Sequence, residues 1–504
     1  MQTTSARRLN FSVWRAAVLA LAVATAACTS APVTNSSPVA SPDTSSATPP
    51  PSGFTSDHGK PEPMDLLGGY GALWHPTEPA KLQGIVHDPR QLSWNDRLAS
   101  WINQHSTPTQ QFRALQDSQL RASDGAEYDQ SITMADALGQ RLGSLYVRGR
   151  LSGKLPLTSR LLNTTDGLVG DYLTSGSAKD AYGYPRPYLR SSSATPVHGD
   201  SQSCAPDKVN AQSLAQLRKG KPWGDANGNL LITRVPAATD TTRSFTSKDV
   251  RLDPYYRGES MCRNGAFPSG HARAAYAVGI TLATLVPELA PSILARTSEA
   301  ANNRIVLGVH YPLDVIGGRI TGEAAASTRW SDERFRNDVL SPARVELVNY
   351  LETSCGARLA TCIKDDKPYA NDPYSGAIVP GGTDQATTGQ PTKALAVYTE
   401  RLSYGFSATR PRGLAASVPS GAENLLLTTF PSLTSDQRRD VLAQTEIDSG
   451  NALDTTPPTP KAVGPGSWQR LNLAAAMSAT VEVRADGTVK VLAVGGSPTT
   501  VHRK

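Results

Sequence analysis

The sequence of 504 residues has only one long apolar run, Ala16 to Ala27, and no later stretch approaches the roughly 20 apolar residues of a membrane-spanning helix. This lack argues against an integral membrane enzyme. Cysteine is scarce, with five residues in the chain, and the basic residues are scattered rather than clustered. The formal net charge of +6 includes three arginines that precede the apolar run. We therefore expect no nucleic-acid binding.

The first 28 residues predict an export signal. Arg7, Arg8 and Arg15 precede the apolar run, which is too short and too rich in small residues to span a membrane. Cys28 follows the small residues Thr25 to Ala27, as in the processing site of a bacterial lipoprotein, where the cysteine is lipidated. Ordinary secretion stays open, because threonine stands where leucine is usual. We expect an extracellular or cell-envelope protein that contacts a membrane only through a lipid at Cys28.

Four cysteines remain beyond the signal: Cys204, Cys262, Cys355 and Cys362. An even number in an oxidising compartment favours two disulfides over a metal site, and the sequence permits three pairings. We expect neighbouring pairs, Cys204 with Cys262 and Cys355 with Cys362. No cysteine is then left for catalysis.

Composition divides the rest of the chain. Residues 29–60 are rich in Ser, Thr and Pro, which predicts a disordered tether, because such a segment cannot bury a core. In residues 61–363, stretches such as Ile132 to Leu151 carry apolar residues at helical spacing, so this region predicts an all-α catalytic domain. A Gly/Pro-rich linker is expected at 364–393, followed by a smaller, mixed accessory segment at 394–504.

Two features are predicted inside that last segment. Thr434 and Gln437 have the spacing of a capping box that opens a short helix. Residues Val481 to Val494 alternate around Asp486 and Gly487, which is typical of a β-hairpin. Neither feature indicates a function for the segment.

His271 follows a Pro-Ser-Gly tripeptide and opens a predicted helix that stops at Pro287. A loop leading into a helix N-terminus presents free backbone N–H groups and the positive end of the helix dipole. Gly270 allows the backbone to approach an oxyanion closely, and the Ser269 hydroxyl can add a donor. The alternative is a simple turn with a capping serine, since a second Pro-Ser-Gly precedes Ala422 without a histidine.

A second histidine, His310, lies just before a predicted helix start, because Pro312 suits the first turn of a helix and not its interior. Asp314 falls in that first turn, where it can accept a hydrogen bond from Nδ1 of His310 and leave Nε2 free as a nucleophile. Arg304 lies six residues earlier, on the preceding helix. The alternative is a histidine capped by aspartate for stability alone.

Lys179 and Arg186 are the cations of a third segment, interleaved with Tyr182, Tyr184 and Tyr188. Arg offers a planar fork to two phosphate oxygens and Lys a compact charge, so the pair suits a phosphoryl dianion. Surface cations are common, and a solvated face is the alternative.

Together, the segments KDAYGYPRP (Lys179–Pro187), PSGH (Pro268–His271) and NRIVLGVHYPLD (Asn303–Asp314) resemble the type 2 phosphatidic acid phosphatase superfamily. That superfamily also contains bacterial class A non-specific acid phosphatases and vanadium haloperoxidases. Its pattern is a lysine seven positions before Arg-Pro, then PSGH, then Ser-Arg followed by a histidine and an aspartate. Asn303 stands where the family has serine, so the hydrogen bonds around Arg304 are expected to differ. The resemblance covers Lys179 to Asp314 and implies a helical-bundle core.

The resemblance also implies the role of each residue. His310 would be the nucleophile that forms a phosphohistidine, Asp314 its orienting partner, and His271 the acid for the leaving oxygen. Water activated by His271 would then release phosphate. The non-bridging oxygens would be held by Lys179, Arg186, Ser269, Gly270 and Arg304.

These roles predict an exported acid phosphatase that uses no metal or cofactor, acts on small phosphomonoesters at mildly acidic pH, and is inhibited by vanadate. The alternative is a vanadium-dependent haloperoxidase, which holds vanadate as its cofactor in the same anion cradle. Two further alternatives fit less well. A lipid pyrophosphate phosphatase is expected to have several membrane helices, and a surface-binding protein has no reason to keep the whole set of charged groups.

Overall fold

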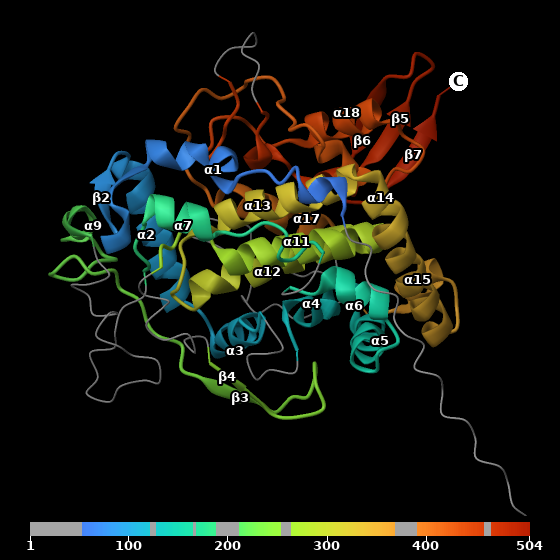
Figure 1. Ribbon diagram of the computed structural model, residues 1–504, viewed down its shortest axis with the longest axis horizontal. Helices are drawn as coiled ribbons and strands as arrows, with labels where there is room; N and C mark the ends of the chain where they lie inside the picture. The colour runs from blue at the N-terminus through green and yellow to red at the C-terminus, as the bar shows by residue number, and fades with distance from the viewer. Residues whose placement is uncertain are drawn as a thin grey trace, which may run out of the picture. The chain divides into compact units, whose positions relative to one another are not determined.

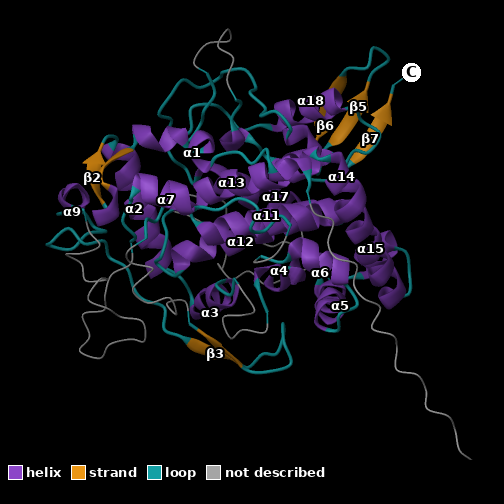
Figure 2. Ribbon diagram, in the orientation of Figure 1, coloured by secondary structure: helices purple, strands orange, loops and turns teal. Residues whose placement is uncertain are grey.

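The computed structural model describes residues 53–120, 128–164, 168–187, 211–253, 264–367, 391–457 and 465–503. Residues 51–504 form one compact unit. The described residues are mostly helical, with three small sheets of two or three strands (Figures 1 and 2). The predicted fold class, an all-α core with a smaller mixed C-terminal segment that contains a β-hairpin, is confirmed.

Several predictions fall on residues outside these ranges. The export signal at 1–28 with Cys28, most of the tether, most of the linker, and the pair Cys204 and Cys262 lie outside the described residues. The domain boundaries likewise stay predictions. At the described end of the tether, Phe54 is buried, and the Arg329 side chain donates to the Asp57 carboxylate at 2.7 Å.

Three helices form the centre of the fold: α11 (Gly270–Leu285), α12 (Ala290–Val306) and α13 (Pro312–Ser331). In α11 every side chain from Ala272 to Leu285 is buried, because its sequence is apolar on all sides. This helix contacts both of the others. Its end before Pro287 and the start of α13 at Pro312 are where the prolines predict them.

Glycines allow α11 and α13 to approach backbone to backbone. A Cβ atom on Gly322 would lie 2.7 Å from Cβ of Tyr276 and 2.9 Å from the carbonyl oxygen of Arg273. One on Gly318 would lie 2.7 Å from the carbonyl oxygen of Ser269. Because no larger residue fits between the two helices, this contact fixes where their N-termini lie relative to each other.

Further helices surround the central three. α2 and α3 contact α12, and α15 contacts α5 and α6 (Figure 1). Asp88 caps the N-terminus of α2, and a capping box of Thr107 and Gln110 opens α3. The stretch predicted as helical from Ile132 to Leu151 is divided at Gly139, which has a φ of +108°. The bounds of these helices are α1 (Pro63–Leu66), α2 (Pro89–Gln104), α3 (Pro108–Asp117), α4 (Gln130–Thr133), α5 (Gln140–Leu151), α6 (Pro156–Leu162), α7 (Gly176–Tyr182), α9 (Gln212–Arg218), α14 (Glu333–Phe335), α15 (Ser341–Cys355) and α16 (Leu359–Asp365).

The described residues of the C-terminal segment form three α-helices and a three-stranded sheet in the order β6-β5-β7. Its elements are α17 (Pro391–Ser403), α18 (Ser435–Thr445), α19 (Leu473–Ala476), β5 (Thr480–Val483), β6 (Val489–Ala493) and β7 (Thr499–His502). The predicted capping box of Thr434 and Gln437 opens α18. The predicted hairpin is β5 and β6, paired antiparallel with Val481 opposite Val491. A third strand, β7, had no signal in the sequence and pairs with β5 in parallel.

Arg319, in the middle of α13, attaches the C-terminal segment to the central helices. Its guanidinium is fully buried and pairs with the Glu323 carboxylate at 2.9 Å. It also donates to the carbonyl oxygen of Gln469 at 2.9 Å. A buried charge requires such partners, so the C-terminal segment completes the surroundings of α13.

Two smaller sheets complete the fold. β1 (Trp74–Glu78) and β2 (Gln83–Val86) pair antiparallel, with an irregularity in register after Pro76. β3 (Ala238–Asp240) and β4 (Val250–Leu252) form the second antiparallel pair. Each has only two strands, so the helices supply nearly all of the packing.

Cys355 and Cys362 form a disulfide with a sequence separation of 7. It joins the end of α15 to α16, and it confirms one of the two predicted pairs. Because disulfides persist in oxidising compartments, the bond agrees with the expectation of export.

Among the described helices, no single one is both long and apolar enough to cross a membrane. α11 and the stretch Pro287–Val306 reach the required length and hydropathy only together, as a pair bent by 117°. Both are almost entirely buried inside the protein.

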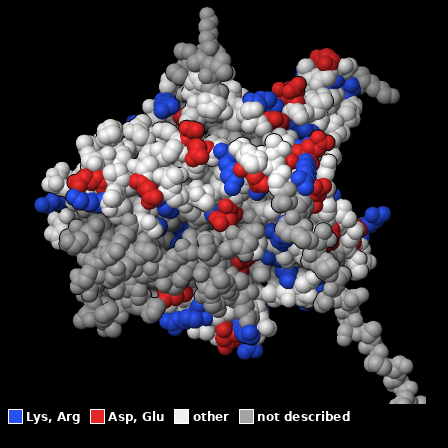
Figure 3. All heavy atoms as spheres, viewed as in Figure 1, with Lys and Arg blue, Asp and Glu red and all other residues white. Residues whose placement is uncertain are grey.

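Charges of both signs are interspersed on the surface. On the face shown in Figure 3, basic and acidic side chains of the described residues lie close to one another. This mixture matches the scattered charge of the sequence. That the protein does not bind nucleic acid stays a prediction.

The glycine contact predicts a loss of stability when it is filled. Gly322→Val should lower the free energy of unfolding by about 1–3 kcal/mol, because the added atoms overpack a backbone contact. Urea denaturation followed by circular dichroism measures this change. Gly59→Val is the matched control, since a Cβ at Gly59 would meet no atom within 4 Å. An equal effect in both variants would contradict the role of the helix contact.

Candidate active site

The three predicted segments meet at the start of α13. The amide of Ser269 donates to the carbonyl oxygen of Asp314 at 2.9 Å, so the loop before α11 is bound to the first turn of α13. In the same loop, the amide of Ala266 donates to the carbonyl oxygen of Tyr184 at 2.7 Å. These two backbone bonds bring together stretches that are far apart in the sequence.

His310 and Asp314 form the predicted pair. Nδ1 of His310 lies 3.0 Å from Oδ2 of Asp314, and both side chains are buried. The same oxygen accepts the amide of Tyr311 at 2.9 Å, which holds the carboxylate in the first turn of α13. With Nδ1 facing the carboxylate, the lone pair of the neutral imidazole lies on Nε2.

Arg186 lies on the other side of the imidazole. Its Nη1 atom is 3.1 Å from Nε2 of His310 and donates to the carbonyl oxygen of Val309 at 3.0 Å. Because a guanidinium can only donate, Nε2 must be the acceptor, which agrees with a proton on Nδ1. A third hydrogen bond, from Nε of Arg186 to the carbonyl oxygen of Asn264 at 3.3 Å, holds the guanidinium near the loop before α11.

Lys179, in the last turn of α7, contacts the same loop. Its ammonium donates to the carbonyl oxygens of Gly265 at 2.8 Å and Ala266 at 3.0 Å. Gly265 is required there, since a Cβ would lie 2.4 Å from the carbonyl oxygen of Lys179. The second predicted cation is therefore placed against the PSGH loop.

Ser269, Gly270 and His271 form the N-terminus of α11. Ser269 is the N-cap, and its Oγ accepts the amide of Ala272 at 3.2 Å. The capping role that the sequence left as an alternative is thus present, but the hydroxyl keeps its hydrogen for donation. Gly270 and His271 are partly exposed, whereas Ser269 is buried, so these two residues form the open side of the site.

Arg304 lies in the last turn of α12, with 3% of its surface exposed. Its charge disfavours protonation of His310 and lowers the pKa of Lys179. The charge of His271 also disfavours protonation of His310. The electrostatic field at His310 therefore includes all of the predicted cationic side chains.

Burial and neighbouring charge both shift the titration of the site. Burial lowers the pKa of His310 well below its ordinary value of 6.5, and the charges of Arg186 and Lys179 lower it further. Burial likewise lowers the pKa of Lys179, with Arg186 as the next cause, and raises the pKa of the Asp314 carboxyl. Cations that destabilise one another in this way favour the binding of an anion.

Asn303, which departs from the family pattern, forms hydrogen bonds away from the imidazole. Its side-chain amide donates to the Asp117 carboxylate of α3 at 2.7 Å. The other oxygen of that carboxylate accepts from Arg296 at 2.6 Å. The residue before Arg304 thus joins a buried ionic cluster between α3 and α12.

Sequence reasoning missed the residues of α2 and α9 that support the site. Asn95 accepts the amide of Leu313 at 3.0 Å, although the two are 218 positions apart. Arg218 pairs with Asp96 and donates to the hydroxyl of Tyr311 at 3.0 Å. No local motif could have identified them, because their partners lie far along the chain and include backbone groups.

Part of the chain is similar to a known family. Residues 162–337 match the PAP2 superfamily. This segment contains α11, α12, α13 and all eight predicted site residues. The resemblance inferred from the three motifs is confirmed over it.

Two curated relatives are acid phosphatases. A non-specific acid phosphatase of Providencia stuartii is 31% identical over 121 residues, which are 22% of this chain and 49% of the relative. An acid phosphatase of Zymomonas mobilis is 33% identical over 116 residues, 23% of this chain and 44% of the relative. The chain thus spans about half the length of the relatives it matches.

The lowered pKa of His310 predicts that its imidazole stays neutral at acidic pH. Because burial and the surrounding cations oppose protonation, His310 should remain uncharged when the pH falls below 6.5. Nitrogen-15 NMR of histidine-labelled protein, with the His310→Asn spectrum subtracted, measures this directly. A signal that becomes imidazolium at about pH 6.5, the ordinary histidine value, would contradict the described environment.

Proposed function

We propose that the protein is an exported, metal-independent acid phosphatase that hydrolyses small phosphomonoesters through a phosphohistidine at His310. One observation carries this proposal: the buried imidazole of His310 is fixed by Asp314 at Nδ1 and by Arg186 at Nε2. This arrangement offers a nucleophilic lone pair beside a phosphate-binding guanidinium. The two acid phosphatase relatives support the same reaction class.

In the first step, Nε2 of His310 attacks the phosphorus atom. The bond from phosphorus to the ester oxygen breaks, and His271 gives its proton to the departing alcohol. Asp314 stabilises the positive charge that develops on the imidazole, through its hydrogen bond to Nδ1. The product is a phosphohistidine, with His271 left neutral.

In the second step, neutral His271 takes a proton from water, and the resulting oxygen nucleophile attacks the same phosphorus. The bond between phosphorus and Nε2 breaks, and its electron pair returns to the imidazole. Inorganic phosphate leaves, and both histidines recover their starting states. Acid and base assistance of this kind typically contributes about 10²–10⁴ in rate.

The cradle for the non-bridging oxygens consists of Lys179, Arg186 and Arg304 with the Ser269 hydroxyl and the Gly270 amide. Lys179 and Arg186 are already held by backbone carbonyls, so little reorganisation is required when the charged transition state forms. Three fixed cations can balance a phosphoryl dianion, which is why we propose that no metal takes part.

Export is part of the same proposal. The export signal predicted at 1–28 supports export, and so does the disulfide between Cys355 and Cys362. Anchoring to the outer face of the membrane by a lipid at Cys28 is the corresponding proposal for the location of the enzyme. Mass spectrometry of the mature N-terminus distinguishes a lipidated Cys28 from a freely secreted form.

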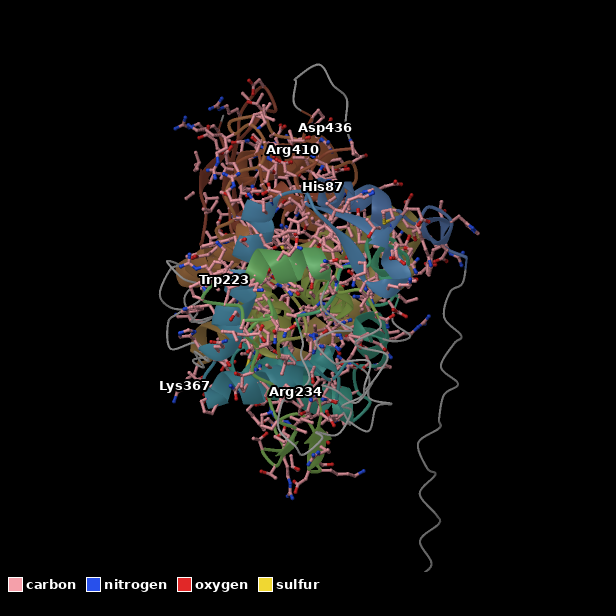
Figure 4. The ribbon with its side chains drawn as sticks, turned by 90° about the vertical axis from the view of Figure 1, so that its left-hand side faces the viewer. His87, Trp223, Arg234, Lys367, Arg410 and Asp436 are labelled. Carbon is pink, nitrogen blue, oxygen red and sulfur yellow. A yellow bond between two sulfur atoms is a disulfide. The ribbon has the colours of Figure 1, made fainter. Side chains whose placement is uncertain are left out.

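Replacement of the nucleophile tests the mechanism. His310→Ala should lower kcat for p-nitrophenyl phosphate by more than about 10³-fold, because no other group can form the intermediate. His87→Ala is the matched control, since His87 is an exposed histidine beside β2 and is labelled in Figure 4. Undiminished hydrolysis in His310→Ala would exclude this nucleophile. Vanadate should inhibit the wild-type protein, whereas halide oxidation after vanadate addition would favour the haloperoxidase.

The dual role of His271 predicts the pH profile. Since its imidazolium must donate a proton in the first step, kcat/KM should decrease as the pH rises into the alkaline range. His271→Ala should remove this alkaline decrease and lose more activity with an alkyl phosphate than with p-nitrophenyl phosphate, whose leaving group needs little protonation. A wild-type rate that keeps rising into the alkaline range would contradict the acid role.

A further inference from the structure

The loop that carries His310 is held at both ends by one helix outside the matched family segment. α2 (Pro89–Gln104) contacts both α12 and α13, and it precedes the family match at 162–337 (Figure 1). We propose that Asn95 and Asn103 of α2 are positioning residues for His310. The inference rests on the proposed function, in which His310 is the nucleophile.

Asn95 binds the C-terminal end of the loop. Its Oδ1 atom accepts the amide of Leu313, the second residue of α13, at 3.0 Å. Amides in the first turn of a helix have no partner within the helix, so this bond satisfies a group that would otherwise be left without one. Asn95 is fully buried, so water cannot replace it readily.

Asn103 binds the N-terminal end of the loop. Its side-chain nitrogen donates to the carbonyl oxygen of Val306, the last residue of α12, at 2.8 Å. The same side chain exchanges two further bonds with the backbone of Thr233, at 2.9 and 2.6 Å. The carbonyl at the end of α12 is thereby fixed relative to α2.

The loop between these two points passes close to Asn103. Gly308 has a φ of +70°, and a Cβ there would lie 3.3 Å from Nδ2 of Asn103 and 2.4 Å from Cγ2 of Ile232. The chain thus makes a left-handed turn in a space that admits only glycine. A turn of this kind retains its geometry only while its two ends are held.

A third contact lies between the two asparagines. Arg218 of α9 binds both carboxylate oxygens of Asp96 at 2.8 Å, and it also donates to the hydroxyl of Tyr311 at 3.0 Å. Asp96 is next to Asn95 and Tyr311 is next to His310. Residues before and after His310 are therefore hydrogen-bonded to α2. Val306 and Leu313 are bound directly, and Tyr311 is bound through Arg218.

α2 itself is also bound to the C-terminal segment. The side-chain nitrogens of Gln91 and Trp94 donate to the carbonyl oxygens of Ser407 and Tyr404, at 2.8 and 3.0 Å. Asn95 and Asn103 are eight residues apart, or about 12 Å along a helix, which is enough to reach both ends of a short loop. A rigid helix fixed in this way can hold the imidazole at its attacking position.

The test separates positioning from stability. Asn95→Ala should lower kcat for p-nitrophenyl phosphate by about 10- to 100-fold, the effect of a displacement near 1 Å at a reacting atom. The inhibition constant of inorganic phosphate should stay within about threefold, because the amide that Asn95 binds belongs to Leu313, which is not a residue of the cradle. A folded Asn95→Ala protein with wild-type kcat, or with phosphate affinity lost in parallel, would overturn the proposal.

Asn472→Ala is the matched control. Asn472 is also a buried asparagine whose side chain accepts the amide of a helix N-terminus, that of Ala475 at 3.1 Å, but it belongs to the C-terminal segment. Both variants should show a similar decrease in melting temperature, and only Asn95→Ala should lose kcat. Equal losses of kcat would mean that the effect is one of general stability.

Two further measurements keep the test decisive if Asn95→Ala does not fold. Asn103→Ala removes the support at the other end of the loop and should also lower kcat, and a folded Asn103→Ala protein with wild-type kcat would overturn the proposal. In the unaltered protein, hydrogen exchange at the Leu313 amide should be as slow as in the middle of α13, and exchange as fast as in exposed loops would overturn the proposal. Failure of the wild type to hydrolyse phosphomonoesters would contradict the proposed function alone, since the exchange measurement does not depend on it.

Discussion

The close packing of α11 against α13 is the constraint on which the rest of the site depends. Both helices begin at the site, and the bond from the Ser269 amide to the Asp314 carbonyl oxygen holds these two beginnings together. Each helix N-terminus contributes partial positive charge, so two dipoles and three cationic side chains act on one small volume. The glycines of α13 make this possible, because a side chain at Gly318 would collide with the backbone of α11. The chemistry of the site therefore begins with the absence of two side chains in a helix interior.

Much of the site could be predicted because its information is local. Proline and glycine mark the helix starts, and the spacing from His310 to Asp314 fits one helical turn, so the hydrogen bond between them follows from short-range geometry. The identical Pro-Ser-Gly before Ala422 shows the limit of such reasoning. It lacks the histidine and leads into a 3-10 helix of five residues, whereas the tripeptide before His271 opens the 16-residue helix α11.

The parts that could not be predicted depend on long-range partners. Asn303 was recognised as a departure from the family pattern, but its partner Asp117 lies on α3, 186 positions away. The hydrogen bonds from Asn95 and Asn103 of α2 could not be predicted for the same reason, because nothing in the sequence distinguishes these asparagines from others. The helical fold class could be predicted because apolar residues recur at helical spacing along the chain. The parallel strand β7 could not be predicted, because its pairing with β5 depends on how the chain folds back after β6, and no short sequence pattern indicates this.

The bonds of Arg319 make the central helices dependent on a distant part of the chain. This guanidinium lies in the middle of α13, yet the carbonyl oxygen of Gln469 that it binds lies 150 positions later in the sequence. A buried cation is stable only with its partners in place, so the surroundings of α13 are complete only when the C-terminal segment is folded against it. A fragment that ends after α13 would contain every motif of the site and still leave this cation without one of its partners.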